Sequence, residues 1–378
     1  MKEVLYHLFR LTLWQWLRWK YRVRILDQPP RGRTPLVVVS NHVNFWDPFL
    51  ISFALRRPVS FVAADGNFRS RPMRFLMTLA GQVPKAKGRT DMQSIRLLQD
   101  LVRGGRAIAV FPEGQRTWDG EPREILPGIE KLVKLLRAPV MAVQLQGAYR
   151  SLPRWSRRGR RGVLEIHFRL LSPDERSREG ITRAIRFSED QWQARRQVRY
   201  VGPGRAEELE TLLFHCHRCG SWDTLVSTGS TLSCSSCGAT AFLTAAGTFR
   251  DHPLPTVASW HRRQMQALGE DLALEAPRSL PCIAREVRVL TGYRTRPLTL
   301  RGEAAVTLGT TELEISIPGR ERWSIPVQEI QGINVQYTRQ LEFYFRGTLF
   351  VLRMQRRSDG AYRFEQSILF LQDLYRHR

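Results

Sequence analysis

The sequence lacks the long apolar run that a membrane-spanning helix requires, which is about 18–20 consecutive residues. Residues 3–20 come nearest, and five polar or charged side chains interrupt them: His7, Arg10, Gln15, Arg18 and Lys20. The same stretch carries tryptophans at positions 14, 16 and 19 beside cations, which favours an amphipathic helix lying in a membrane interface. The alternative is an ordinary amphipathic helix packed on its own domain.

Lysine and acidic residues are scarce relative to arginine. The chain has 59 Lys and Arg, of which only six are Lys, against 35 Asp and Glu, which gives a net charge of +24. This balance favours phosphate-bearing partners, namely anionic lipid surfaces, nucleic acid or a phosphorylated substrate. Genomic base bias toward arginine is the alternative. The apolar fraction of 42% excludes a disordered chain, and 378 residues leave room for two or three domains.

Cysteine is also scarce, with five in all, and four of them form two C-x2-C pairs: Cys216, Cys219, Cys234 and Cys237. The N-terminus has no uninterrupted apolar core followed by a small-residue cleavage site, so we expect a reducing cytosolic compartment in which paired cysteines bind metal. Four thiolates at this spacing predict a zinc ribbon whose structural zinc supplies folding energy. Iron in a rubredoxin-like site, a redox pair and two disulfides are the alternatives.

Short apolar runs alternate with helical patterns from residue 35 to 170. We predict strands at 36–40, 59–64, 107–111, 139–145 and 162–169, and helices near 48–56, 70–80, 91–103 and 128–137. This alternation is typical of an α/β domain with a mostly parallel sheet. We expect a charged, largely helical region at 171–210 to complete this domain.

The first polar turn that carries chemistry follows the apolar run 37–39. It contains His42 and, five residues later, Asp47. Pro48 suits the first turn of a helix and Asp47 suits its N-cap, so the stretch predicts a strand, a loop and a helix. A general base needs a histidine and a carboxylate that holds the imidazole in one tautomer, and Asp47 can reach the far ring nitrogen. The alternative is a capping aspartate beside a surface histidine.

The second polar turn follows the predicted strand at 107–111 and reads FPEGQR over residues 111–116. It places the Glu113 carboxylate and the Arg116 guanidinium at the carboxyl edge of the sheet, where open α/β sheets build their sites. Gly114 lets backbone approach a ligand closely, and Arg116 offers a planar fork matched to phosphate. The alternative, if this motif stood alone, is an ordinary polar turn between a strand and a loop.

Together the two turns resemble the glycerolipid acyltransferase family, whose best-known members are the 1-acyl-glycerol-3-phosphate acyltransferases. The resemblance is carried by Asn41-His42 with Asp47 and by residues 111–116, in this order and separation, and it covers about residues 35–150. A Gly-to-Arg segment, 81–89, lies at the place of the family's third block, and the apolar run 138–143 lies at its fourth. Residues 84–87 depart from the usual third block, and this departure affects the expected identity of the acceptor more than the type of reaction.

The resemblance implies a role for each matching residue. His42 would be the general base that takes the proton from an acceptor hydroxyl as this hydroxyl attacks a thioester carbonyl, and Asp47 would orient His42. The implied substrate-binding residues are Asn41, Arg89, Glu113, Gly114 and Arg116. Of these, Arg89 and Arg116 would grip a glycerol phosphate. No nucleophilic Ser or Cys and no catalytic cofactor is expected, because the acyl group passes directly from its carrier to the alcohol.

The chain after the α/β domain changes character. Residues 249–290 have a mostly helical pattern, 293–354 alternate with period two as short strands, and a helix follows at about 361–377. This last module looks like a pleckstrin-homology-type barrel, with other half-open barrels as alternatives. We expect an interface helix at 1–34, an acyltransferase domain at 35–210, a zinc ribbon at 211–245, a helical connector at 246–290 and a pleckstrin-homology-like β domain at 291–378.

The expected function is transfer of a fatty acyl group from acyl-CoA or acyl carrier protein to the hydroxyl of lysophosphatidic acid or a related lysophospholipid in phospholipid synthesis. The protein would be peripheral on the cytoplasmic face of the cell membrane and would contact an anionic surface. Nucleic acid is not expected as a partner, because no aromatic–basic motif accompanies the Cys pairs. The alternatives are acylation of glycerol 3-phosphate or another lipid acceptor, and a non-catalytic scaffold that binds lipid or nucleic acid.

Overall fold

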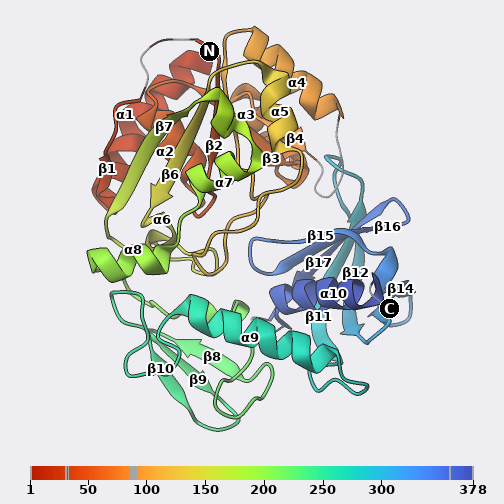
Figure 1. Ribbon diagram of the computed structural model, residues 1–378. Coiled ribbons are helices and arrows are strands. Elements are labelled where there is room, and N and C mark those ends of the chain that lie inside the picture. Colours follow the sequence, from red (N-terminus) through yellow and green to blue (C-terminus); the bar gives the residue numbers. More distant parts are fainter. Residues whose placement is uncertain (1, 30–31, 33, 86–91, 357–358, 377–378) are drawn as a thin grey trace. The chain divides into compact units, whose positions relative to one another are not determined.

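The computed structural model describes residues 2–29, 32, 34–85, 92–356 and 359–376. The chain divides into two compact units. Unit 1 contains the described residues up to Pro203 together with Ala245–Gly247, and unit 2 contains Gly204–Thr244 and the described residues from Thr248 onward. Each unit has its own sheets and helices (Figure 1).

Unit 1 is built on a mainly parallel sheet. Its described strands are β1 (Val23–Ile25), β2 (Leu36–Ser40), β3 (Val59–Ala64), β4 (Val83–Lys85), β5 (Ala107–Val110), β6 (Val140–Gln146) and β7 (Leu164–Leu171). They lie in the order β1-β7-β6-β2-β5-β3-β4, and β6 and β7 pair antiparallel while the other described pairings are parallel. The predicted α/β domain with a mostly parallel sheet is confirmed. The two three-residue strands, β1 and β4, were not predicted.

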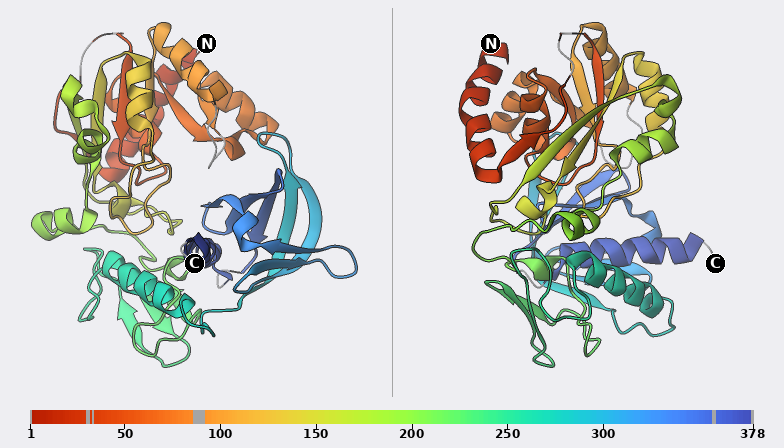
Figure 2. Two further views of the ribbon diagram at one scale, coloured as in Figure 1. Left: turned by 45° about the vertical axis from the view of Figure 1, so that its right-hand side comes forward. Right: turned by 60° about the vertical axis from the view of Figure 1, so that its left-hand side comes forward.

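Helices cover both faces of this sheet. They are α1 (Lys2–Tyr21), α2 (Asp47–Ala54), α3 (Arg71–Leu79), α4 (Met92–Arg103), α5 (Ile129–Leu136), α6 (Ala148–Ser151), α7 (Arg178–Ile185) and α8 (Glu189–Arg196), with 3-10 turns η1 (Asp65–Phe68) and η2 (Pro173–Arg176). Alternate residues of β2 point to opposite faces. Leu36 and Val38 pack in one apolar core with α1 and α2, and Val37 and Val39 pack in another with α4 and α5. Figure 2 shows these two pairs of helices on opposite faces of the sheet.

Helix α1 packs on unit 1 through one side and exposes apolar side chains on another. Trp14, Leu17 and Tyr21 are buried in the core that also contains α2. Leu11 and Trp19, in contrast, are 71% and 62% exposed. The helix is therefore packed on its own domain, which was one of the two alternatives, and contact of its exposed side with a membrane stays a prediction. No helix among the described residues has the length and apolarity to cross a bilayer.

The cysteine-rich part of unit 2 is a small antiparallel sheet beside a helix. Its strands are β8 (Leu225–Thr228), β9 (Thr231–Cys234) and β10 (Thr240–Phe242), preceded by the 3-10 turn η3 (Leu209–Thr211) and followed by α9 (Val257–Leu272). Gln264 of α9 is buried, and its Oε1 accepts hydrogen bonds from the backbone N–H groups of Phe214 and His215 at 2.7 and 3.0 Å. These bonds attach the first cysteine pair to the helix.

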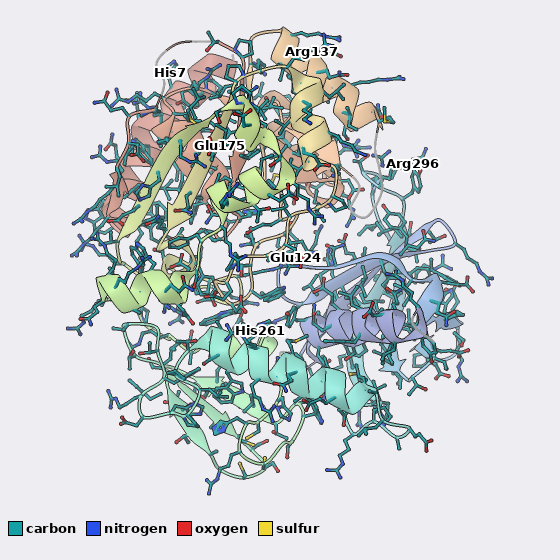
Figure 3. All side chains as sticks on the ribbon, in the orientation of Figure 1. His7, Glu124, Arg137, Glu175, His261 and Arg296 are labelled. Atoms are coloured by element: carbon teal, nitrogen blue, oxygen red, sulfur yellow. The ribbon has the colours of Figure 1, made fainter. Side chains whose placement is uncertain are left out.

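The rest of unit 2 is an antiparallel sheet that curls into a half-barrel, with a final helix (Figure 2). Its strands are β11 (Cys282–Gly292), β12 (Thr299–Leu308), β13 (Glu312–Ser316), β14 (Arg322–Pro326), β15 (Gln331–Gln336), β16 (Gln340–Phe345) and β17 (Thr348–Met354), joined by the turn η4 (Val327–Glu329) and followed by α10 (Ala361–Arg376). The order is β14-β13-β12-β11-β17-β16-β15. His261 of α9, labelled in Figure 3, hydrogen-bonds through Nε2 to the Tyr362 hydroxyl of α10 at 2.8 Å.

The sequence prediction is wrong at one boundary in unit 2. Residues 249–290 were expected to be mostly helical, but α9 ends at Leu272 and Cys282–Gly292 form strand β11. β11 alternates buried residues (Cys282, Ala284) with exposed ones (Ile283, Arg285), which is the strand period. An irregularity between Ala284 and Val287 interrupts that alternation, because Arg285 and Glu286 are both exposed. Within the stretch 293–354, which was expected to form short strands, Thr299–Leu308 form one long strand, β12.

Candidate active site

The two polar turns meet because their strands are neighbours. β2 and β5 pair in parallel with Val39 opposite Val110, so the residues that follow both strands emerge at the same carboxyl edge. The backbone N–H of Thr117 donates to the His42 carbonyl at 2.9 Å, which joins the turns directly. This edge is where α/β sheets form ligand sites.

His42 and Asp47 form a hydrogen-bonded pair in this turn. The His42 Nδ1 lies 2.8 Å from Asp47 Oδ2, and the Asp47 side chain is fully buried. Because an ionised carboxylate only accepts hydrogen bonds, this contact places the proton of a neutral imidazole on Nδ1 and leaves Nε2 as the acceptor. One-fifth of the His42 side chain remains exposed.

Asp47 is not the N-cap that its position before Pro48 suggested. It is the first residue of α2, whose N-cap is Trp46. The Asp47 carboxylate turns back into the loop, where Oδ2 also accepts from the backbone N–H groups of Val43 and Asn44, both at 2.8 Å. The same oxygen thus fixes the loop and the imidazole. Pro48 lies in the first turn of the helix, as predicted.

Glu113 holds the backbone of His42. Its Oε2 accepts from the His42 N–H at 2.9 Å, and its Oε1 accepts from the Arg123 N–H at 3.3 Å. Burial raises the pKa of Glu113 to about 7, against these two hydrogen bonds, which lower it. Both carboxylate oxygens of Glu113 therefore accept hydrogen bonds from the backbone of the loops around His42. Direct contact of Glu113 with a substrate stays a prediction.

Phe111 supports the imidazole ring. The rings of Phe111 and His42 stack with centroids 3.9 Å apart and planes 13° apart. Phe61 of β3 in turn stacks on Phe111, with centroids 5.7 Å apart. Phe111 stood in the motif that the sequence singled out, but its role was missed. A signal was present, since an aromatic residue directly after a strand beside the His-bearing strand is placed to contact that histidine.

The site lowers the proton affinity of His42. Burial is the largest cause of the lowered pKa of His42, and the positive charges of Arg116 and Arg154 act in the same direction, whereas Asp47 opposes them. A pKa below the ordinary value of 6.5 keeps the imidazole neutral at pH 7. His42 is therefore in the protonation state that a general base needs.

Arg154 is a cation of this site that the sequence did not indicate. It is 7% exposed, and its Nη1 donates to the Arg116 carbonyl at 3.0 Å and to Gln115 Oε1 at 3.3 Å. Its guanidinium lies over the Trp118 ring, 4.0 Å from the centroid. No motif marks it, because it follows α6, far along the chain from the FPEGQR turn.

The remaining predicted residues are placed as follows. Asn41 is buried, and its side chain exchanges two hydrogen bonds with the backbone of Leu145 on β6, at 2.9 and 2.8 Å. Gly114 has φ +70° in the turn after β5, and a Cβ there would lie 2.7 Å from Leu126. Arg116 is half-buried. Arg89 lies outside the described residues. Substrate contacts of all four stay predictions.

The four paired cysteines of unit 2 gather into one cluster. Their Sγ atoms all lie within 4.8 Å of one another, and the pairs Cys216–Cys237 and Cys219–Cys234 are both 3.8 Å apart. Tetrahedral zinc with Zn–S bonds of about 2.3 Å would place its sulfurs about 3.8 Å apart. The donor set and its spacing therefore fit a metal ion bound by four thiolates.

A parallel α/β domain with a buried His–Asp pair and two cations at its carboxyl edge defines a class of site that can deprotonate a hydroxyl next to an anionic group. Residues 20–146 match the family model described as acyltransferase. The chain is 27% identical to the chloroplastic 1-acyl-sn-glycerol-3-phosphate acyltransferase BAT2 of Brassica napus over 154 residues, and 30% identical to the probable 1-acyl-sn-glycerol-3-phosphate acyltransferase of Mycoplasma genitalium over 123 residues. These similarities relate residues 20–146 of unit 1 to the acyltransferase family.

The likeness is confined to part of each protein. The Brassica match covers 39% of this chain and 44% of the relative, and the Mycoplasma match covers 31% and 46%. The chain thus spans less than half the length of these curated relatives. The crystal structure of the 1-acyl-sn-glycerophosphate acyltransferase PlsC from Thermotoga maritima aligns with a TM-score of 0.43 at 17% identity, over 51% of this chain and 81% of that one.

Proposed function

We propose that this protein transfers a fatty acyl group from acyl-CoA or acyl carrier protein to the free hydroxyl of lysophosphatidic acid or a related lysophospholipid. The observation that carries the proposal is the 2.8 Å pair of His42 Nδ1 and Asp47 Oδ2 at the edge where the FPEGQR turn also lies. The names of the relatives, which are 1-acyl-sn-glycerol-3-phosphate acyltransferases, favour this acceptor class.

The proposed step is a single acyl transfer. Nε2 of His42 takes the proton of the acceptor hydroxyl while the hydroxyl oxygen bonds to the thioester carbonyl carbon. The C–S bond then breaks, the carrier leaves as a thiolate, and the proton returns to it as the thiol. Asp47 keeps the other proton on Nδ1 and stabilises the imidazolium that forms in between. One ester forms and one thioester breaks, so no redox partner is needed.

Arg116 and Arg154 are the proposed contacts of the acceptor phosphate. Both guanidinium groups lie close enough to lower the pKa of His42, so an anion bound to them would lie beside the base. Guanidinium groups suit phosphate because their planar N–H groups match its oxygens. The like charges of two neighbouring arginines would also be offset by a dianionic ligand.

In unit 2 we propose a structural zinc held by Cys216, Cys219, Cys234 and Cys237, which would make this sheet a zinc ribbon. The ion would cross-link the two cysteine turns and supply folding energy to this small three-stranded sheet. The curled sheet with its final helix is proposed to be pleckstrin-homology-like. Wild-type protein purified without bound zinc would refute the zinc assignment, and bound iron would favour the rubredoxin-like alternative.

We further propose that the protein is peripheral on the cytoplasmic face of the cell membrane. The exposed apolar side chains of α1, including Leu11 and Trp19, together with the net charge of +24, support contact with an anionic bilayer. The acceptor and the product would both reside there.

The test uses purified full-length protein, labelled acyl-CoA and acyl carrier protein, and a panel of lysophospholipids with glycerol 3-phosphate. His42→Ala should lower turnover by about 10²–10⁴-fold, the contribution of a positioned base. A matched control is His167→Ala, because His167 also pairs with a carboxylate, Nδ1 to Asp27 Oδ2 at 3.2 Å, but on β7. His42-independent transfer, or no transfer to any acceptor, would refute the proposal. Transfer to glycerol 3-phosphate alone would reassign the acceptor.

A further inference from the structure

Helix α3 is amphipathic, yet every one of its residues is exposed or half-buried. Met73, Phe75 and Leu76 are 40%, 67% and 41% exposed. A helix of nine residues is marginal in water, because helices in proteins gain most of their stability by packing an apolar face. The apolar residues of α3 thus indicate a surface that is covered when the protein works.

The ends of α3 are built to form this helix independently of the core. Ser70 is its N-cap, and the Ser70 Oγ accepts from the Met73 N–H at 3.3 Å, while Pro72 lies in the first turn. After the helix, Gln82 Oε1 accepts from the Phe61 N–H at 2.8 Å and ties the chain back to β3. These contacts fix the two ends of the helix, while Met73, Phe75 and Leu76 remain largely exposed.

The position of α3 links it to the candidate active site. It follows the carboxyl end of β3, and β4 rejoins the sheet with Val83 opposite Val62, so the connection lies at the edge that carries His42. Phe61, which the loop after α3 contacts, stacks on Phe111, and Phe111 stacks on His42. Phe45, in the His42 loop, is also 54% exposed at this edge.

The charge around α3 identifies the covering partner. Residues 65–85 contain four cations, Arg69, Arg71, Arg74 and Lys85, against one acidic residue, Asp65, which pairs with Arg69 at 3.8 Å. A short helix with exposed aromatic and aliphatic side chains beside arginines fits the boundary of headgroups and acyl chains in an anionic bilayer. A second copy of this chain would bring the same positive charge to the contact and would be repelled.

We propose that α3 is a membrane-contacting element that turns the carboxyl edge of the unit 1 sheet toward an anionic lipid bilayer. Met73, Phe75 and Leu76 enter the lipid, and Arg71 contacts phosphate groups. The purpose of this contact, delivery of a lipid acceptor to His42, rests on the proposed function. The contact itself is independent of catalysis and can be measured without turnover.

The test is co-sedimentation of the full-length protein with vesicles of phosphatidylcholine alone and of phosphatidylcholine with phosphatidylglycerol. The triple variant Met73→Ser, Phe75→Ser, Leu76→Ser should bind the anionic vesicles about tenfold more weakly, because three apolar contacts are lost. The control variant is Leu135→Ser, Leu170→Ser, Val201→Ser, at positions that are 47%, 60% and 60% exposed elsewhere in unit 1. It should bind within about twofold of wild type.

A charge variant tests the partner. Arg71→Glu should weaken binding to the anionic vesicles and leave binding to phosphatidylcholine unchanged, whereas Arg103→Glu, at the end of α4, should change neither. Wild-type vesicle binding by the α3 triple variant would overturn the proposal. A wild-type dimer that the triple variant converts to monomer, with vesicle binding intact, would also overturn it in favour of a second copy.

Activity separates this proposal from the proposed function. With a short-chain lysophosphatidic acid dispersed as monomers, the α3 triple variant should turn over like wild type, and with a long-chain acceptor in vesicles it should lose activity in parallel with binding. If wild-type protein transfers no acyl group to any acceptor, the proposed function fails, and the vesicle measurements still decide whether α3 contacts lipid.

Discussion

At the residue scale, His42 is held by contacts from both turns. Its ring meets Asp47 and Phe111, its N–H donates to Glu113, and its carbonyl accepts from Thr117. Such a set of contacts fixes the direction of Nε2, which a general base requires because proton transfer depends on geometry first and pKa second. Substitutions here should therefore separate orientation from proton affinity.

Asp47→Asn tests orientation. The amide can still accept from the backbone of Val43 and Asn44, but it no longer fixes the tautomer or stabilises imidazolium. We expect turnover to fall by about 10²-fold or more with little change in KM. Because Asp47 raises the pKa of His42, its loss should also shift the acidic limb of the pH–rate profile to lower pH. An unchanged turnover would contradict the assigned role.

Arg154→Ala tests the second cation. Removing its positive charge should raise the pKa of His42, so the acidic limb of the pH–rate profile should move to higher pH. The KM for a phosphate-bearing acceptor should rise about tenfold or more, because a charged hydrogen bond contributes about 1.5–3 kcal/mol. A neutral monoacylglycerol acceptor is the control and should show no such rise in KM.

Glu113 makes stability depend on pH. Its pKa is raised from 4.5 to about 7 in the folded protein, so the folded state binds the proton more tightly than the unfolded state. The resulting stabilisation is fully present below pH 4.5 and is lost as the pH rises through 7, and it amounts to at most about 3 kcal/mol. In urea titrations at pH 5 and 7.5, wild type should lose more stability than Glu113→Gln. Equal losses would contradict this.

At the element scale, the sequence predicted most of unit 1 because periodicity and turn signals agreed there. The predicted strand at 36–40 has the bounds of β2, and the helix near 91–103 is α4 over the residues described. β1 and β4 escaped prediction because three residues carry no usable period. The prediction that Asp47 is an N-cap was wrong because an aspartate before a helix has the same sequence signal whether it caps the helix or binds the preceding loop. Only its hydrogen bonds to His42, Val43 and Asn44 distinguish the two roles.

The cysteine cluster gives a prediction for a whole element. Metal removal by a strong chelator should unfold the region of β8–β10, because the thiolates then lose the ion that joins them. Hydrogen exchange of the strand amides should rise in the chelated protein, and Cys234→Ser should reproduce this rise and lower the metal content. Slow exchange that persists after complete metal loss would contradict a structural role for the metal.

At the scale of the whole molecule, positive charge is the dominant property. A net charge of +24 should make vesicle binding strongly dependent on salt, since screening shortens the reach of surface charges to about 3 Å at 1 M. We expect binding to anionic vesicles to fall by about tenfold or more between 0.05 and 0.5 M salt. The residual binding at high salt should depend on the apolar side chains of α1 and α3.

Neither the site cation Arg154 nor the exposed face of α3 was predictable from the sequence. Arg154 is one of 59 basic residues, and only the return of the chain past α6 brings it to Arg116. The pattern of α3 is that of any amphipathic helix, whose apolar face normally joins a core. Whether that face is covered depends on the neighbours that the fold supplies.

The pairing of β1 with β7 bears on how the protein is made. Val23 lies opposite Leu164 at the edge of the sheet, so the N-terminal strand finds its partner only after some 140 further residues have left the ribosome. During that interval α1 can pack on α2 and on Leu36 and Val38 of β2, which follow it closely in the chain, but not yet on β6 and β7. The core that holds this aromatic helix is therefore completed only late in synthesis, and until then its tryptophans are partly uncovered.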